Sequence, residues 1–133
     1  MSDPPKNFKS PGGFRRLLSA LRYTYAGFRH AIRHEVAIRE ELIALAILVP
    51  VSAALPVSTL EHLILVLTMM LVVLVEFLNS AIESTVDRIS LERHPLAGQA
   101  KDLGSAAVLI AVLMWGLSWL VIVGPLVVRW ARS

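Results

Sequence analysis

The chain contains no cysteine among its 133 residues. Disulfide bonds and thiolate metal sites are therefore excluded, and the redox compartment stays undetermined. The first 40 residues hold no apolar core of the kind that a cleavable signal needs, so we expect no such signal. No G-x-x-x-x-G-K-[ST] loop and no protein-kinase signature set occur. A nucleotide site, if one exists, must be built from scattered residues.

Charged residues are also scarce, at 17% of the composition, whereas hydrophobic residues make up 56%. The mean hydropathy of +0.65 is too apolar for an ordinary soluble domain of this length. The net charge of +3 could suggest a nucleic-acid partner, but eight of the 13 Lys and Arg residues precede residue 40. We therefore expect one membrane domain over 1–133 and no nucleic-acid partner.

The N-terminal third divides into a tail and a helix. Residues 1–13 are rich in Pro, Gly, Ser and Lys, and we expect them to be a flexible tail. Residues 14–34 follow a helical period, with aromatic and aliphatic side chains on one face and Arg15, Arg22, Arg29 and Arg33 beside it. This pattern favours an amphipathic helix on the surface of an anionic bilayer. A soluble basic helix for nucleic acid or a protein partner is the alternative.

Three apolar runs follow, over 42–60, 62–84 and 103–128. Each is close to or above the ~20 residues that a membrane-spanning helix needs. Pro50 and Pro56 predict a kink or an early end in the first run. Residues 57–61 read as a tight connection and residues 88–101 as a polar loop. The predicted fold is all-α, a bundle of three transmembrane helices with an N-terminal amphipathic surface helix.

A polar stripe interrupts the end of the second run. Glu76, Asn79, Glu83 and Asp87 share one side of a helix that advances about 100° per residue. Ionisable groups at membrane depth usually face a protein interior or a wet cavity and mark a functional site. A solvated helix end is the alternative, above all for Asp87.

Basic residues predict the orientation. The N-terminal segment has eight Lys or Arg and the 57–61 loop has none. Positive charge marks the cytoplasmic side, so the N-terminus and the second loop should be cytoplasmic. Seven polar groups from three segments then converge at that side: Glu35, Glu76, Glu83, Asp87, His94, Lys101 and Asp102.

Carboxylates near a lysine suit a magnesium ion and a ligand that carries phosphate. Mg²⁺ is commonly held by one or two carboxylates together with substrate phosphates, and a lysine neutralises developing charge. Glu76 fits a general base because it lies deepest. The spacing by itself leaves phosphoryl transfer and cation passage both open.

The motifs EFLNSAIE at 76–83, VDR at 86–88 and AKDLGSAAVL at 100–109 resemble the signature of the prokaryotic diacylglycerol kinase family. The resemblance spans roughly residues 14–124. It implies a small inner-membrane enzyme with three spans and a cytoplasmic active site. It also implies a homotrimer with active sites shared between subunits, which uses MgATP to convert diacylglycerol to phosphatidic acid. No other protein partner is implied.

The resemblance also implies roles for individual residues. Glu76 matches the general base, and Glu35 and Glu83 match the carboxylates that hold the metal on ATP. Further nucleotide-binding positions correspond to Arg16, Tyr23, Glu92, Arg93, His94, Lys101 and Asp102. Positions that bind the lipid or line its path correspond to Arg16, Glu41, Glu76, Asn79, Ser105 and Trp119.

Three alternatives remain. Another branch of the family phosphorylates undecaprenol; Glu41 and Gly104-Ser105 favour the diacylglycerol branch, whereas His94-Pro95-Leu96-Ala97 resembles either. A small cation- or proton-conducting bundle is a different class, but the outer halves of the three predicted helices lack an ionisable residue that would continue a path. A non-enzymatic assembly subunit would leave Glu76, Glu83 and Lys101 without a role.

Overall fold

The computed structural model describes residues 13–89 and 94–133. Within these residues the chain forms four helices and no strand, which confirms the all-α prediction: α1 (Gly13–His34), α2 (Val36–Ala54), α3 (Thr59–Ile89) and α4 (Pro95–Ala131). The tail predicted over residues 1–13 lies outside the described residues except for Gly13, which begins α1.

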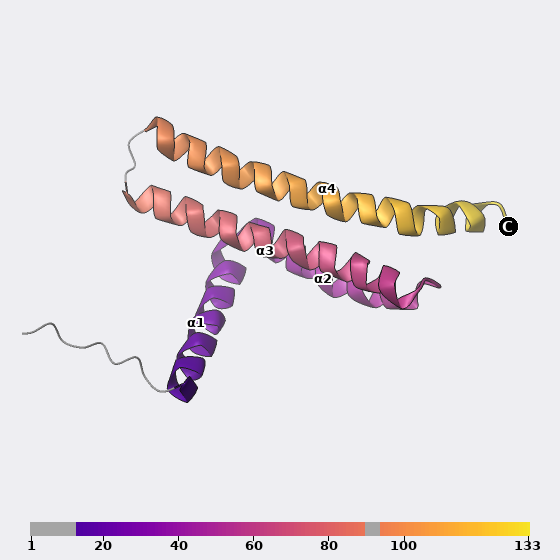
Figure 1. Ribbon diagram of the computed structural model, residues 1–133, viewed down its shortest axis with the longest axis horizontal. Coiled ribbons are helices and arrows are strands. Elements are labelled where there is room, and N and C mark those ends of the chain that lie inside the picture. The colour runs from indigo at the N-terminus through magenta and orange to yellow at the C-terminus, as the bar shows by residue number, and fades with distance from the viewer. Residues whose placement is uncertain (1–12, 90–93) are drawn as a thin grey trace, which may run out of the picture.

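The long helices α3 and α4 lie side by side, α2 flanks α3, and α1 leaves this bundle at a steep angle (Figure 1). Helix α3 is central because it packs against both α2 and α4. Its buried face repeats at three- and four-residue intervals, as expected for a helix with neighbours on one side. The buried apolar residues of this face are Leu65, Met69, Val72 and Val73.

Helix α2 differs from the run predicted over 42–60. It begins at Val36 and continues through Pro50, but it ends at Ala54. Leu55 is extended, with φ −77° and ψ 141°. A residue that precedes proline is pushed out of the helical region by the proline ring, so Pro56 sets this end.

Helix α3 begins three residues before the predicted span of 62–84. Both the backbone N–H and the hydroxyl of Ser58 donate to Oε2 of Glu61, each at 2.7 Å, and the N–H of Glu61 donates to Ser58 Oγ at 3.3 Å. This reciprocal arrangement is a capping box, which satisfies helix donors that otherwise have no partner. The connection between α2 and α3 is therefore short, as predicted.

The prediction of a loop over all of residues 88–101 is wrong. Helix α3 continues to Ile89, and α4 begins at Pro95. Proline at the first helical position needs no N–H partner and already has a helical φ. His94 caps the helix, since its Nδ1 accepts a hydrogen bond from the N–H of Leu96 at 3.2 Å. Lys101 and Asp102 thus lie on a helix rather than in a loop.

Two of the described helices, α3 and α4, are long and apolar enough to cross a membrane. Only 28% of the apolar window in α3 and 6% of that in α4 is buried within the chain. The core helix of a soluble protein would be mostly buried, so the exposed aliphatic surface here fits contact with lipid. Between the two helices, the hydroxyls of Thr68 and Ser118 form a hydrogen bond of 2.9 Å.

Gly104 on α4 packs directly against Asn79 on α3. Both residues are buried, and a Cβ added to Gly104 would overlap the side-chain amide of Asn79. Small residues permit this kind of approach between membrane helices. The contact lies at Gly104, the first of four small residues, Gly104-Ser105-Ala106-Ala107.

We predict that Gly104→Ala destabilises the protein by about 1–3 kcal/mol, because the added methyl group overfills a packed contact. Thermal unfolding in detergent measures the effect. Gly98→Ala and Gly116→Ala are matched controls on the same helix, since a Cβ at either position meets nothing within 4 Å. In a protein that carries Asn79→Ala, Gly104→Ala should no longer lower the stability. Equal stability of Gly104→Ala and the two controls would contradict the prediction.

Candidate functional site

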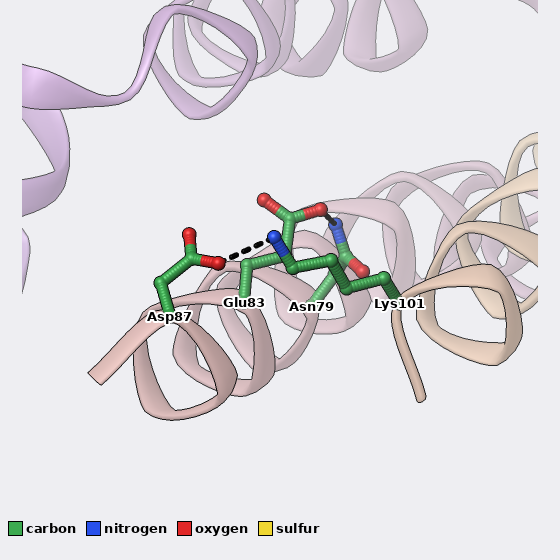
Figure 2. A network of polar contacts seen from close by, with 4 residues as sticks. All are labelled: Asn79, Glu83, Asp87 and Lys101. Atoms are coloured by element: carbon green, nitrogen blue, oxygen red, sulfur yellow. Dashed lines mark hydrogen bonds and ion pairs between the residues drawn. The ribbon is translucent and has the colours of Figure 1, made fainter. Parts of the chain in front are cut away.

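The polar stripe of α3 is present as a continuous helical face. Asn79 is buried and donates from Nδ2 to Oε1 of Glu83 at 3.1 Å, one turn further along the helix (Figure 2). No described residue pairs with the other amide atom of Asn79, the carbonyl Oδ1. Asn79 therefore holds the Glu83 carboxylate in place and packs against α4 at the same time.

An ion pair joins the stripe to α4. Lys101 Nζ donates to Asp87 Oδ1 at 2.6 Å, and Figure 2 shows the lysine reaching across from α4 toward α3. Both side chains remain partly open to solvent, with exposed fractions of 39% and 55%. Glu83 also acts electrostatically on Lys101. One cation thus faces two carboxylates of the stripe.

Glu76, the first carboxylate of the stripe, is partly buried; Glu35 and Glu83 act on it electrostatically, and Glu76 in turn acts on Glu41. Glu83 follows on the same helix, Glu35 lies at the junction of α1 and α2, and Glu41 lies on α2. Glu35 is extended, at φ −105° and ψ 108°, so the chain turns there. The structure therefore places Glu35 and Glu83 within electrostatic range of Glu76, and Glu41 joins them from α2.

Helix α1 touches this region through one aromatic contact. The rings of Phe28 and Phe77 meet edge to face with centroids 5.0 Å apart, and Phe77 follows Glu76 directly. The N-terminal half of α1 leads away from the bundle (Figure 1). Arg16 and Tyr23 are exposed, and no hydrogen bond or ion pair with another described residue ties them to the carboxylates.

Glu41 borders a small cavity of about 50 Å³ inside the bundle. Its Oε2 is buried, and so is Nε1 of Trp115 in the same lining; neither atom has a hydrogen-bond partner among the described residues. Buried polar atoms of this kind are usually satisfied by water or a ligand. The sequence alone does not place Trp115 beside Glu41, because that position depends on the register of two helices.

The remaining predicted residues lie on α4 or beside it. Asp102 and Ser105 are exposed, and His94 is occupied in capping the helix. Trp119 is partly buried, and its Nε1 has no partner within the described part of the chain. Glu92 and Arg93 fall outside the described residues.

No three His, Asp or Glu side chains within residues 13–89 and 94–133 gather closely enough to hold a metal ion by themselves. Carboxylates are nevertheless the ligands that Mg²⁺ prefers, and Mg²⁺ seldom takes an all-protein cage. Glu35 and Glu83, which both lie within electrostatic range of Glu76, carry carboxylates of this kind.

The fold and the site define a helical membrane protein with a cluster of carboxylates and one lysine at one end of its bundle. A family model described as prokaryotic diacylglycerol kinase matches residues 22–123. The chain belongs to this family, and its activity is accordingly that of a kinase.

The names of similar proteins agree with this assignment. A protein named diacylglycerol kinase from Pseudomonas aeruginosa is 45% identical over 115 residues, which cover 86% of this chain and 94% of the relative. The protein of that name from Escherichia coli is 44% identical over 110 residues, covering 83% and 90%. One from Helicobacter pylori is 41% identical over 122 residues, covering 90% and 92%.

We predict that a carbodiimide, which joins a carboxylate to an amine without a spacer, links Asp87 to Lys101 in the folded protein. The two groups are already 2.6 Å apart, and the chain has only three lysines. Peptide mass spectrometry should detect the linked pair as a product lighter by one water molecule. Asp87→Asn should remove it and Asp102→Asn should retain it; a link from Lys101 to Glu83 in the parent protein would contradict the assigned pairing.

Proposed function

We propose that the protein transfers the γ-phosphate of MgATP to the primary hydroxyl of diacylglycerol, giving phosphatidic acid and ADP. The observation that carries the proposal is the position of Glu76. It is partly buried where the apolar part of α3 ends, and it lies within electrostatic range of Glu35 and Glu83. A base at this depth can reach the hydroxyl of a lipid that remains in the membrane. Asp87 and Lys101 are accessible to solvent, from which the nucleotide would enter.

In this mechanism Glu76 is the general base. It accepts the proton of the lipid hydroxyl as the hydroxyl oxygen forms a bond to the γ-phosphorus. The bond between that phosphorus and the bridging oxygen of ADP breaks in line with the attack. Lys101 lies where its positive charge would offset charge on the phosphate oxygens.

Glu35 and Glu83 would hold the magnesium ion that enters with ATP. That ion would neutralise phosphate charge, which four neighbouring carboxylates otherwise repel. Asn79 fixes the Glu83 carboxylate through the 3.1 Å hydrogen bond and so positions one of the two metal ligands. The other nucleotide-binding positions that we propose are Arg16, Tyr23, Glu92, Arg93, His94, Lys101 and Asp102.

The lipid would reach Glu76 along the bundle. Glu41 and Asn79 are two of the polar side chains that we assign to its path, and both have buried oxygens without a partner among the described residues. A glycerol hydroxyl or carbonyl of the lipid could satisfy such atoms. Arg16, Ser105 and Trp119 complete the proposed lipid-contacting set with Glu76.

We propose an inner-membrane location with the N-terminus and active site in the cytoplasm. Helices α3 and α4 supply two spans, and α2, of 19 residues, supplies the third. Helix α1 would lie on the membrane surface. The apolar side chains that α4 leaves exposed fit contact with lipid and with further copies in a homotrimer.

We predict that Glu76→Gln lowers kcat by about 10²–10⁴-fold, because the amide cannot accept the hydroxyl proton. The fold should persist, since glutamine keeps the size and shape of the side chain. Glu40→Gln is the matched control on the exposed face of α2 and should keep full activity. Full activity of Glu76→Gln in purified protein would refute the role of this residue.

The reaction itself is tested with γ-labelled MgATP and purified protein in lipid micelles that contain either diacylglycerol or undecaprenol. We expect labelled phosphatidic acid, and we expect chelation of Mg²⁺ to abolish it. Labelled undecaprenyl phosphate as the main product would move the chain to the other branch of the family. Absence of any labelled lipid from folded protein would contradict the kinase mechanism and favour an ion-conducting bundle.

A further inference from the structure

Helix α1 carries a basic hollow that the proposed mechanism does not use. The hollow has a volume of about 430 Å³ and is lined by Arg22, Arg29, Arg33, His30 and His34, with no carboxylate in its wall. We call these five residues the α1 basic hollow. None of them belongs to the carboxylate cluster or to the proposed nucleotide-binding and lipid-binding residues.

The three arginines share one side of the helix. Arg29 and Arg33 follow Arg22 by seven and eleven residues, which returns the helix to nearly the same direction each time. In the described residues none of these arginines forms an ion pair with a carboxylate. The rings of His30 and His34 lie with centroids 4.7 Å apart, one turn from each other. Three unpaired guanidinium groups and two imidazoles therefore face a single space.

The setting of the hollow points to a ligand at the membrane surface. The same helix exposes Phe14, Leu17 and Leu21, apolar side chains that no other described part of the chain covers. A helix with apolar side chains beside arginines lies at the level of lipid headgroups. The ligand best matched to this position is therefore a lipid headgroup with negative charge.

We propose that the α1 basic hollow binds the phosphomonoester headgroup of phosphatidic acid, at a place separate from the carboxylate cluster. Guanidinium groups bind phosphate oxygens in a bidentate manner, and three of them match a terminal phosphate better than the singly charged, doubly esterified phosphate of other lipids. The choice of phosphatidic acid rests on the proposed function, because it is the product of that reaction. The hollow then retains phosphatidic acid on the same protein that forms it.

Native mass spectrometry of the full-length protein in detergent tests the proposal. The protein is titrated with dioleoyl phosphatidic acid, dioleoyl phosphatidylglycerol or inorganic phosphate, and bound lipid is counted per chain. The test variant is Arg22→Gln/Arg33→Gln. The matched control, Arg129→Gln/Arg132→Gln, removes the same charge near the other end of the protein. Circular dichroism confirms that each variant keeps its helices.

We expect phosphatidic acid to bind the parent more tightly than phosphatidylglycerol does, and Arg22→Gln/Arg33→Gln to weaken it by at least about tenfold. Arg129→Gln/Arg132→Gln should change it by less than about twofold. Equal binding to the parent and the test variant, an equal loss in the control, or full displacement by inorganic phosphate would overturn the proposal. If the test variant misfolds, Arg22→Lys/Arg33→Lys replaces it. We expect this variant to lose less affinity for phosphatidic acid, and unchanged affinity would again contradict the proposal.

Kinase assays on the same samples separate this inference from the proposed function. Arg22→Gln/Arg33→Gln should retain the initial rate of the parent, measured before phosphatidic acid accumulates. An inactive parent that still binds phosphatidic acid through these arginines would refute the proposed function and leave the site intact. If the parent is active but the substitutions at Arg22 and Arg33 leave its affinity for phosphatidic acid unchanged, the site alone is refuted.

Discussion

The contact between Asn79 and Gly104 is the constraint on which the polar end of the bundle depends. From this contact α3 runs eight residues on to Asp87, about 12 Å, whereas α4 runs back three residues to Lys101, about 4.5 Å. The long lysine side chain covers the remaining distance and reaches Asp87 at 2.6 Å. A bulkier residue at 104 would separate the helices and pull this cation away from the stripe. The absence of a side chain at Gly104 thus allows Lys101 to pair with Asp87.

The charges of the chain are separated into two regions of opposite sign. The carboxylates of Glu35, Glu41 and Glu83 interact electrostatically with Glu76, and α1 gathers arginines that form no ion pair with a carboxylate among the described residues. A phosphate approaching the carboxylates needs a metal ion to offset the repulsion, whereas a phosphate approaching α1 needs none. This difference is the physical reason to assign MgATP to one region and a metal-free anionic headgroup to the other.

Helical periodicity was enough to predict that α3 carries its polar groups on one side, because that property belongs to a single helix. The ends of the helices are harder to predict from the sequence, because they depend on a few local contacts. Pro95 falls in the predicted loop although it opens α4 with His94 as cap, and Pro56 ends α2 before the apolar run ends. The pairing of Lys101 with Asp87, and the position of Trp115 opposite Glu41, required the register of two helices, which a single sequence does not contain.

Helix α1 places a geometric condition on the proposed site. Its C-terminal half is anchored by Phe28 against Phe77, while the half that contains Arg16 leads away from the bundle (Figure 1). A nucleotide held at Glu35 and Glu83 therefore lies nearer to the anchored half than to Arg16. In the homotrimer that we propose, a neighbouring copy of the chain would cover the free half of α1 and part of the exposed apolar surface of α4. This geometry agrees with active sites shared between subunits, the arrangement that the family resemblance implies and that we propose for this protein.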